Sequence, residues 1–427
     1  MDAQKQTRRI NRDRSERGEQ APRGAKQIVI PMNRAEYDEI WSDARAMRAC
    51  VDQFLAEFPE LFPAGMAKGY AFHGFDRESR KQPGVRLRQV MLNNGSAYWL
   101  RPSFLLSYMA GTVDDVWYPL VLASVNVPAW VLTMGFGHND MYWQRLLERL
   151  GRHSLVGTTV RDPQRLPGHL VADEHHVKWC GEKGFIATTA GSGCLLGVAL
   201  SKSASEDALT PAYGDFVQEA RDLQPDYVPQ TVNTDGWGGT RNAFLKWFPN
   251  IALILCFLHG FLKIRDRLRK AHELHCRVWD VFRAQTAEEF RRLMTQLLEW
   301  ADTETWPAPV RAMLHKLRDK TDDYVIAYEH PGCHRTSNLV DRLMNRLCRL
   351  MYAGRGLHGH QFHSELRLRG WALLSNFRPF APRAGTHREY QSPAHRLSGK
   401  RYHDHWLHNL LVSGSLWGVR QLKHGIR

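Results

Sequence analysis

The sequence predicts an α/β protein with a mixed β-sheet near its middle and helices before and after it. Three observations lead to this fold class. Residues 170–200 contain three apolar segments separated by short turns, which is typical of an antiparallel meander. Two further apolar segments, at 227–234 and 250–258, each follow a helical pattern, and this alternation is typical of parallel strands. From about 260 to 333 the pattern becomes helical and highly charged, which indicates a helical insertion.

Composition narrows the function classes. The chain has 427 residues, 43% of them hydrophobic, with 14 tryptophans, and this excludes a wholly disordered protein. The 58 Lys and Arg against 44 Asp and Glu give a net charge of +14, which favours a nucleic acid as partner over a membrane. Seven cysteines without a CxxC pair indicate neither a disulfide framework nor a zinc ribbon. No apolar stretch resembles a secretory signal, so we expect a cytoplasmic protein.

The N-terminal part is predicted to bind DNA. Residues 1–30 form a basic arm that we expect to be disordered, because its first 26 residues hold eight basic and four acidic side chains and almost no large apolar ones. Such an arm either solubilises the protein or contacts phosphates. The region 31–160 then begins with a helical pattern over 35–62, and 86–92 is a strand candidate.

Residues 112–151 predict three short helices. Thr112 precedes two acids and is a suitable N-cap, Pro128 suits the start of the second helix, and Asn139 caps the third. The uncharged stretch within this segment contains prolines and glycines, so we interpret it as two short helices and a turn and not as a membrane span. The three helices resemble a helix-turn-helix, although other small helical bundles share the pattern.

Residues 161–380 predict the catalytic domain. The expected order is three strands, a helix over 205–222, a strand, a helix over 240–248 and a last buried strand. This order is that of a ribonuclease-H-like domain, in which the first three strands are antiparallel and the later ones parallel. A helix is also expected after Asn338. Residues 381–427 are expected to be a basic, His-rich tail. Its histidines are interpreted as DNA-facing or solvated because no acid or cysteine accompanies them at a useful spacing: His403, His405 and His408.

Three acids lie where a catalytic centre of such a domain needs them. Asp173 falls within the first strand, Asp235 ends the fourth, and Asp341 lies in the first turn of the helix after Asn338. Each residue alone has an ordinary interpretation as a turn or cap residue. Together, converging carboxylates repel one another and require cations, and hard oxygen ligands favour Mg²⁺ or Mn²⁺. Two ions about 4 Å apart can activate an attacking oxygen and stabilise a leaving one.

Four motifs carry a family resemblance: Leu170-Val-Ala-Asp173-Glu-His, Val232-Asn-Thr-Asp235-Gly-Trp, Cys256-Phe-Leu-His259 and Arg335-Thr-Ser-Asn-Leu-Val-Asp341-Arg. With them the chain resembles bacterial insertion-sequence transposases of the DDE/D type. The spacing of 106 positions from Asp235 to Asp341 exceeds what a plain ribonuclease-H fold holds, and such transposases fill this gap with a helical insertion. Most of these enzymes have Glu as the third acid, and Glu365 is therefore the alternative to Asp341.

The resemblance implies a DNA transposase that cuts the ends of a mobile element and joins the 3′-hydroxyls to target DNA by two-metal phosphoryl transfer. Asp173, Asp235 and Asp341 would hold two Mg²⁺ (or Mn²⁺) ions. His259 would hydrogen-bond a phosphate or a carboxylate, with Cys256 as buried packing. The implied partners are double-stranded DNA, as terminal inverted repeats and target, and a second copy of the chain in a homodimer.

Two further residues are candidates for nucleic-acid contacts. Trp237 either stacks on an unpaired base or caps the core, and Arg335 either neutralises a phosphate near the site or is a solvated surface residue. The same acids or motifs are also compatible with two other functions. One is a ribonuclease-H-like nuclease or resolvase that cuts without strand transfer, and the other is a non-catalytic DNA-binding protein derived from a transposase.

Overall fold

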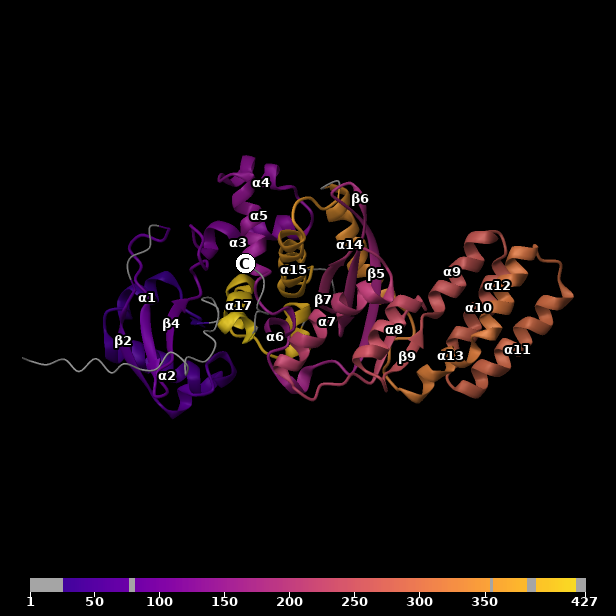
Figure 1. Ribbon diagram of the computed structural model, residues 1–427, viewed down its shortest axis with the longest axis horizontal. Helices are drawn as coiled ribbons and strands as arrows, with labels where there is room; N and C mark the ends of the chain where they lie inside the picture. Colours follow the sequence, from indigo (N-terminus) through magenta and orange to yellow (C-terminus); the bar gives the residue numbers. More distant parts are fainter. Residues whose placement is uncertain (1–25, 77–80, 354–355, 382–388, 420–427) are drawn as a thin grey trace, which may run out of the picture.

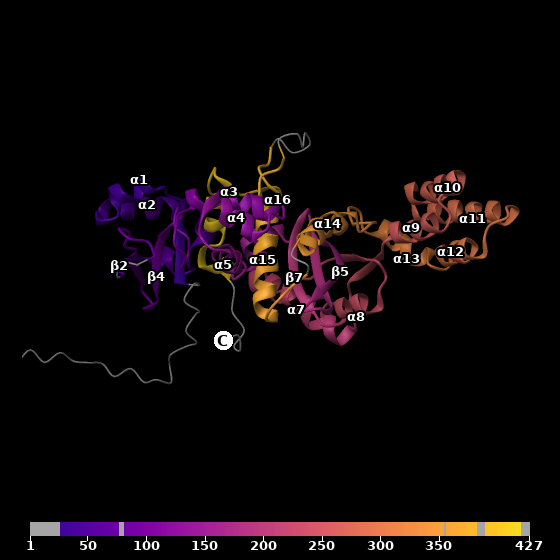
Figure 2. The same ribbon diagram turned by 90° about the horizontal axis from the view of Figure 1, so that it is seen from above.

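The computed structural model describes residues 26–76, 81–353, 356–381 and 389–419. The molecule is elongated and its parts follow one another along the long axis (Figure 1). A small N-terminal sheet lies at one end, a larger sheet lies in the middle, and a group of helices lies at the far end; the view from above shows the same succession (Figure 2). Both sheets are mixed, which confirms an α/β fold. Within the described residues, no helix combines the length and the apolar character that crossing a membrane requires.

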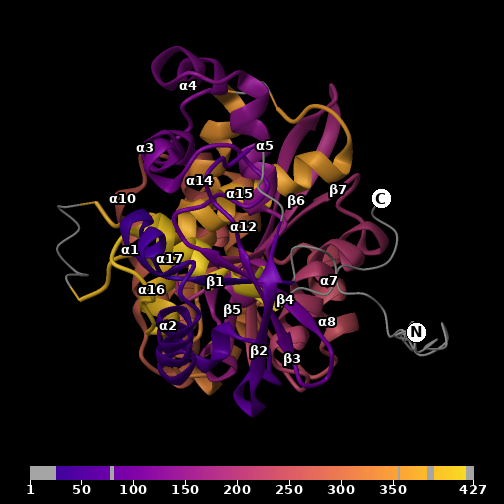
Figure 3. The same cartoon turned by 90° about the vertical axis from the view of Figure 1, so that its left-hand side faces the viewer.

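The N-terminal sheet has four strands in the order β1-β4-β3-β2, with β1 parallel to β4 and the other pairs antiparallel. Figure 3 looks onto this end of the molecule. The strands are β1 (Gln27–Ile30), β2 (Tyr70–Phe75), β3 (Arg88–Leu92) and β4 (Ala97–Pro102). The helices beside them are α1 (Arg34–Ile40) and α2 (Ala44–Glu57).

This sheet corrects the expectation of a mainly helical N-terminal region, and the strand candidate at 86–92 is confirmed as β3. The segment 27–30, assigned to the basic arm, is the buried strand β1, whereas residues 1–25 of that arm lie outside the described residues. Gln27 pairs with Trp99, so the signal for β1 lies some seventy residues away and local periodicity cannot reveal it. The helix expected over 35–62 is divided, because Asp43 caps the start of α2 through the N–H groups of Arg45 and Ala46.

The three helices expected over 112–151 are present as α3 (Val113–Ser124), α4 (Ala129–Phe136) and α5 (Asp140–Leu150). Their starts follow from the predicted caps. Thr112 and Asp115 form a capping box, and the Asn139 side chain accepts a hydrogen bond from Tyr142 N. The second helix begins directly after Pro128.

The central sheet has five strands in the order β7-β6-β5-β8-β9. The first three strands form an antiparallel meander, and β8 and β9 run parallel to β5. The predicted succession of strands and helices is confirmed. Its members are β5 (His169–Trp179), β6 (Glu182–Gly191), β7 (Cys194–Ser201), α7 (Glu206–Leu223), β8 (Thr231–Thr234), α8 (Gly238–Trp247) and β9 (Ala252–Leu255).

Helices cover both faces of this sheet, and alternate residues of β5 point to opposite faces. Leu170 and Ala172 belong to the core that contains residues of α7 and α8. Val171 belongs to the core on the other face, which contains residues of α14 (Asn338–Ala353) and α15 (Gln361–Phe377). This alternation directs the next residue, Asp173, toward the side of α14.

The predicted helical insertion is confirmed between β9 and α14, and it forms the far end of the molecule (Figure 1). Its helices are α9 (Phe257–Arg267), α10 (His272–Arg283), α11 (Ala287–Thr303), α12 (Ala308–Asp319) and α13 (Thr321–Val325). They enclose a core of their own that includes Leu274, Phe290 and Leu314. Leu255 and Phe257 join this core at the end of β9 and anchor the insertion to the central sheet.

The expectation of a C-terminal tail is wrong for residues 389–419. This segment contains α16 (Pro393–Ser398) and the fully buried α17 (Trp406–Ser413), which lies between the two sheets (Figure 1). Ser415 Oγ accepts a hydrogen bond of 3.1 Å from Val29 N and donates one of 2.7 Å to the Leu61 carbonyl. A helix buried on all sides lacks the apolar stripe by which a surface helix is detected. Residues 420–427 lie outside the described residues.

Candidate functional site

Three carboxylates converge at one edge of the central sheet: those of Asp173, Glu174 and Asp235. One oxygen of each lies within 4.8 Å of the others. The parallel register aligns Val171 with Asn233, so continuing each strand by two residues brings Asp235 level with Asp173. The structure thus brings together two of the three predicted acids and adds Glu174.

Local hydrogen bonds fix each carboxylate. Asp173 Oδ1 accepts a hydrogen bond of 2.9 Å from Glu174 N, and Asp235 Oδ1 accepts one of 2.8 Å from Trp237 N. The Glu174 carboxylate accepts a hydrogen bond from the Thr240 hydroxyl on α8. Gly236, at φ 92°, allows the sharp turn that follows Asp235. The three acids therefore come from β5 and from the loop between β8 and α8, all held by backbone or hydroxyl donors.

The charges at this site are unfavourable without a cation. Burial, followed by the charges of Glu174, Asp235 and Asp341, raises the pKa of Asp173 to about 7. Burial is also the main cause of the raised pKa of Glu174. A divalent cation between the oxygens would offset this repulsion, and a set of carboxylate oxygens suits Mg²⁺ or Mn²⁺. The residues present therefore fit a hard divalent metal.

Asp341 lies beside this cluster, in the first turn of α14. It is not one of the three residues within 4.8 Å of one another, but its charge is among those that raise the pKa of Asp173. Its Oδ2 accepts a hydrogen bond of 2.8 Å from Ser337 Oγ. Asp341 therefore faces the centre from the opposite side to Glu174, as a fourth carboxylate.

Cys256 and His259 lie between the carboxylates and the insertion. Cys256 was expected to be simple packing, yet its thiol donates a hydrogen bond of 3.3 Å to Ser337 Oγ and accepts one of 3.2 Å from Ser337 N. Hydrogen bonding with Cys256 raises the pKa of His259 to about 9 despite partial burial. His259 Nδ1 is buried and has no hydrogen-bond partner among the described residues, so the ring keeps one polar atom for a ligand.

Glu365, the alternative third acid, does not belong to this site. It lies on α15, where its Oε1 accepts a hydrogen bond of 3.1 Å from Leu200 N on β7. In the sheet, β7 is the edge strand opposite β9, and two strands separate it from β8, the strand that Asp235 follows. The alternative is therefore wrong, because α15 places this carboxylate on the far edge strand.

The two predicted nucleic-acid residues differ in their surroundings. Arg335 is part of the packing of the insertion: its guanidinium donates to the carbonyls of Phe282 and Ala284 and stacks on the rings of Phe282 and Tyr328. These contacts correct the phosphate role expected for it. Trp237 stays 52% exposed, with Nε1 donating a hydrogen bond of 2.7 Å to the Ala204 carbonyl. It is therefore not a core cap, and its indole faces solvent two residues from Asp235.

The helices expected to read DNA have an unusual surface. The sequences of α3 and α4 contain no Lys or Arg, and their exposed side chains include Trp117, Tyr118, Trp130 and Met134. Such a surface offers no cationic side chain for phosphate contacts. DNA recognition by residues 112–151 stays a prediction, and within them Arg145 and Arg149 of α5 would have to supply the charge for the backbone contacts.

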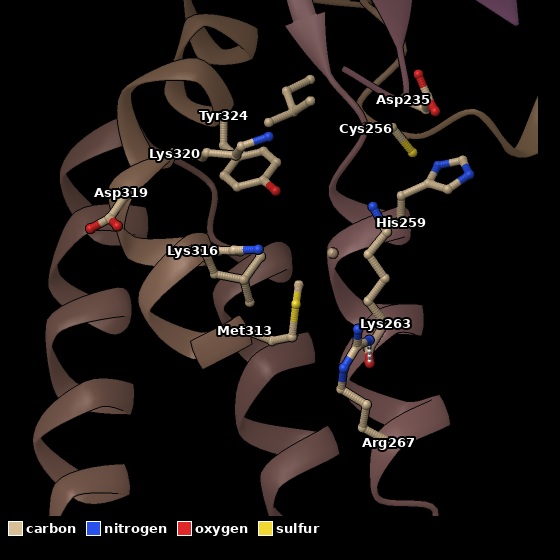
Figure 4. Close-up of a pocket in the computed structure, with 13 residues that line it drawn as sticks. Asp235, Cys256, His259, Lys263, Arg267, Met313, Lys316, Asp319, Lys320 and Tyr324 are labelled. Atoms are coloured by element: carbon tan, nitrogen blue, oxygen red, sulfur yellow. Dashed lines mark hydrogen bonds between the residues drawn. The ribbon is translucent and has the colours of Figure 1, made fainter. Parts of the chain in front are cut away.

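A cleft of about 550 Å³ opens from the acids into the insertion. Asp235 and His259 lie at its inner end, and its walls are α9 and α12 (Figure 4). Four basic side chains line it: Lys263, Arg267, Lys316 and Lys320. The centre can therefore hold a cation among its carboxylates and, directly beside them, an anion.

Sequence reasoning missed Glu174 and this cleft. Adjacent residues of a strand point to opposite faces, and Glu174 approaches the site from the α8 side, where its carboxylate accepts a hydrogen bond from Thr240. The acidic pair in Asp173-Glu174 was the available signal. No pattern in the sequence indicates the cleft, because its two basic pairs lie about fifty residues apart in a generally charged segment.

Comparison with models of known protein families gives no match, and no curated protein matches the sequence.

Proposed function

We propose that the protein is a metal-dependent phosphoryl-transfer enzyme acting on DNA, specifically a DDE/D-type transposase with a ribonuclease-H-like catalytic domain. One observation carries this proposal: carboxylates from β5 and from the end of β8 converge, with the carboxylate of Asp341 on α14 beside them, on the inner strands of a sheet ordered β7-β6-β5-β8-β9. Three antiparallel strands followed by two parallel ones is the arrangement expected of a ribonuclease-H-like domain. The helical insertion between Asp235 and Asp341 agrees with the transposase resemblance.

The chain's own groups have distinct tasks in this proposal. Asp173, Glu174, Asp235 and Asp341 would hold two Mg²⁺ or Mn²⁺ ions, which would supply Lewis-acid activation of the nucleophile and stabilisation of the leaving oxygen. Thr240 and Ser337 hold the carboxylates of Glu174 and Asp341 in position. His259, with its free Nδ1, donates to a phosphate oxygen near Asp235. Catalysis then rests on positioning and charge, without a covalent protein–DNA intermediate.

The proposed partners are the inverted repeats at the ends of a mobile element, the target DNA and a second protomer, since two ends are cut together. The test is an assay with a plasmid that carries the gene and its flanking DNA, incubated with purified protein, a target plasmid and Mg²⁺. We expect cut element ends and joined products, both absent after Asp173→Asn, Asp235→Asn or Asp341→Asn.

Two control variants make this test specific. Glu182→Gln changes an exposed acid at the far end of the β5–β6 hairpin, and Glu365→Gln changes the acid on α15; both are expected to keep activity. Full activity of Asp173→Asn or Asp235→Asn would contradict the catalytic assignment. Cut ends without joined products would indicate a nuclease or resolvase, and metal-dependent DNA binding without cutting would indicate a non-catalytic derivative.

A further inference from the structure

The cleft beside the acids has two basic walls. Lys263 and Arg267 are four residues apart on α9, and Lys316, in the last turn of α12, is four residues from Lys320, the C-cap of that helix. Side chains at this spacing lie one above the other on the same helix face. Figure 4 shows Lys316 and Lys320 extending from their helical segment toward the helix that carries Lys263. The result is two facing pairs of cations along one channel.

Two acids also line the cleft, Asp235 at its inner end and Asp319 next to Lys320, but neither pairs with the four basic side chains. None of the four side chains forms an ion pair with any residue that the structure describes. Their neighbours on the same helices differ: Arg265 pairs with Asp266 at 3.3 Å, and Arg318 pairs with Asp319 at 2.9 Å. Cations held close together without counter-ions attract a polyanion.

The floor of the cleft is apolar. It consists of Leu255, Met313, Leu317 and the ring of Tyr324, all buried. Gly260 lets α9 pack closely on this floor, because a Cβ there would lie 2.5 Å from Leu317 Cδ2. An apolar, partly aromatic floor between cationic walls matches a nucleotide strand, whose bases and sugars are apolar on their faces and whose phosphates lie outside.

The volume of the cleft, about 550 Å³, favours an unpaired strand over a duplex as its ligand. It falls within the range of small-ligand pockets, roughly 300–1,000 Å³, and so accommodates a short stretch of unpaired strand. A duplex is too large to enter, because its major groove alone admits a whole α-helix. The inner end at Asp235 and His259 would bring the bound strand directly to the acids.

We propose that this cleft binds an unpaired nucleic-acid strand, with its phosphates against Lys263, Arg267, Lys316 and Lys320. The proposal rests on the function proposed above, and it deepens it by naming how a strand enters the site. Tyr324 lies beside the bases, and His259 lies nearest the phosphate that reaches Asp235. The remaining duplex stays outside the cleft.

The test measures binding in the absence of chemistry. Full-length protein in EDTA is titrated against a fluorescein-labelled single strand of about 12 nucleotides, and anisotropy is followed from about 50 to 200 mM NaCl. The variant Lys263→Ala/Lys316→Ala removes one cation from each wall. The matched control, Arg265→Ala/Arg318→Ala, removes two ion-paired cations from the same helices.

We expect the cleft variant to bind the strand about tenfold more weakly and its salt slope to decrease by about 1.4, at about 0.7 for each lost phosphate contact. The control is expected to stay within twofold of wild type, and the melting temperatures of both to be unchanged. Equal loss in the two variants, or no loss in the cleft variant, would overturn the proposal.

Two further arms identify the ligand. Binding of the matched duplex is expected to change less than twofold in the cleft variant; an equal loss for the duplex contradicts an unpaired-strand site. Thymidine monophosphate at the same nucleotide concentration is expected not to displace the strand; displacement contradicts a strand-binding cleft and favours a small-phosphate site. Asp173→Asn is expected to lose cleavage but to retain strand binding. Loss of cleavage therefore tests the proposed function, and loss of strand binding tests the cleft proposal.

Discussion

The Ser337 hydroxyl donates a hydrogen bond of 2.8 Å to Oδ2 of Asp341, across one turn at the start of α14. The same serine contacts the Cys256 thiol, 81 positions earlier in the chain, at the end of β9. The insertion begins after Cys256 and ends before Ser337, so its two ends are joined directly beside a carboxylate of the site. This contact explains how a long helical insertion leaves the geometry of the acids intact.

Ser337→Ala tests whether this contact positions Asp341. Without the hydroxyl, the carboxylate loses its donor and rotates more freely, so we expect roughly tenfold weaker Mn²⁺ binding by isothermal titration calorimetry. Ser337→Thr keeps a hydroxyl and is the control, expected to bind as wild type does. Unchanged affinity in the alanine variant would show that Ser337 does not orient the acid.

Glu174→Gln tests the acid that the sequence interpretation overlooked. The amide keeps the size of the side chain and the contact with Thr240 but removes a charge from the cluster, so we expect Mn²⁺ affinity to fall by about an order of magnitude or more. Paramagnetic broadening or calorimetry measures this effect. Glu182→Gln, at an exposed position, is expected to change nothing; if both variants bind Mn²⁺ alike, Glu174 is not a ligand.

The buried ion pair between Glu219 on α7 and Arg369 on α15 ties the helices of the two sheet faces together. Glu219 Oε2 also accepts hydrogen bonds from the backbone N–H groups of Leu155 and Val156. Removing one buried charge leaves the other uncompensated, so Glu219→Ala is expected to lower the free energy of unfolding by about 3–5 kcal/mol in urea denaturation.

The control for this ion pair is Asp38→Asn, which breaks the exposed pair with Arg34. An exposed pair contributes little, so this change is expected to cost less than about 1 kcal/mol. A similar cost for the two substitutions would refute the structural role of the buried pair.

His408 predicts an acid-sensitive contact between α17 and the N-terminal sheet. Its Nδ1 lies 2.7 Å from Ser103 Oγ, and burial together with His403 and His405 lowers its pKa to about 3. In the unfolded chain His408 has an ordinary pKa near 6.5. Between about pH 6.5 and pH 3 it therefore binds a proton in the unfolded chain that it does not bind in the folded protein. Stability is therefore full above about pH 6.5 and falls as the pH drops toward 3, by at most about 1.4 kcal/mol per pH unit from this group.

Urea denaturation between pH 4 and 8 measures this dependence. His408→Asn keeps a polar group near Ser103 but does not titrate, and we expect a flatter profile than that of wild type. His73→Asn, at an exposed position of β2, is the control and should retain the wild-type profile. An unchanged slope in His408→Asn would contradict the assignment.

The amino-acid pattern by itself determined the central sheet, its order of strands and helices, the insertion and the positions of Asp173 and Asp235, because local periodicity and strand ends carry those signals. Only the tertiary structure decided the rest. The strand β1 depends on a partner near Trp99, α17 is buried on every side, and the place of Glu365 depends on which sheet edge α15 covers. The role of Glu174 and the basic cleft depend on contacts between distant segments, and such contacts leave no periodic trace in a single sequence.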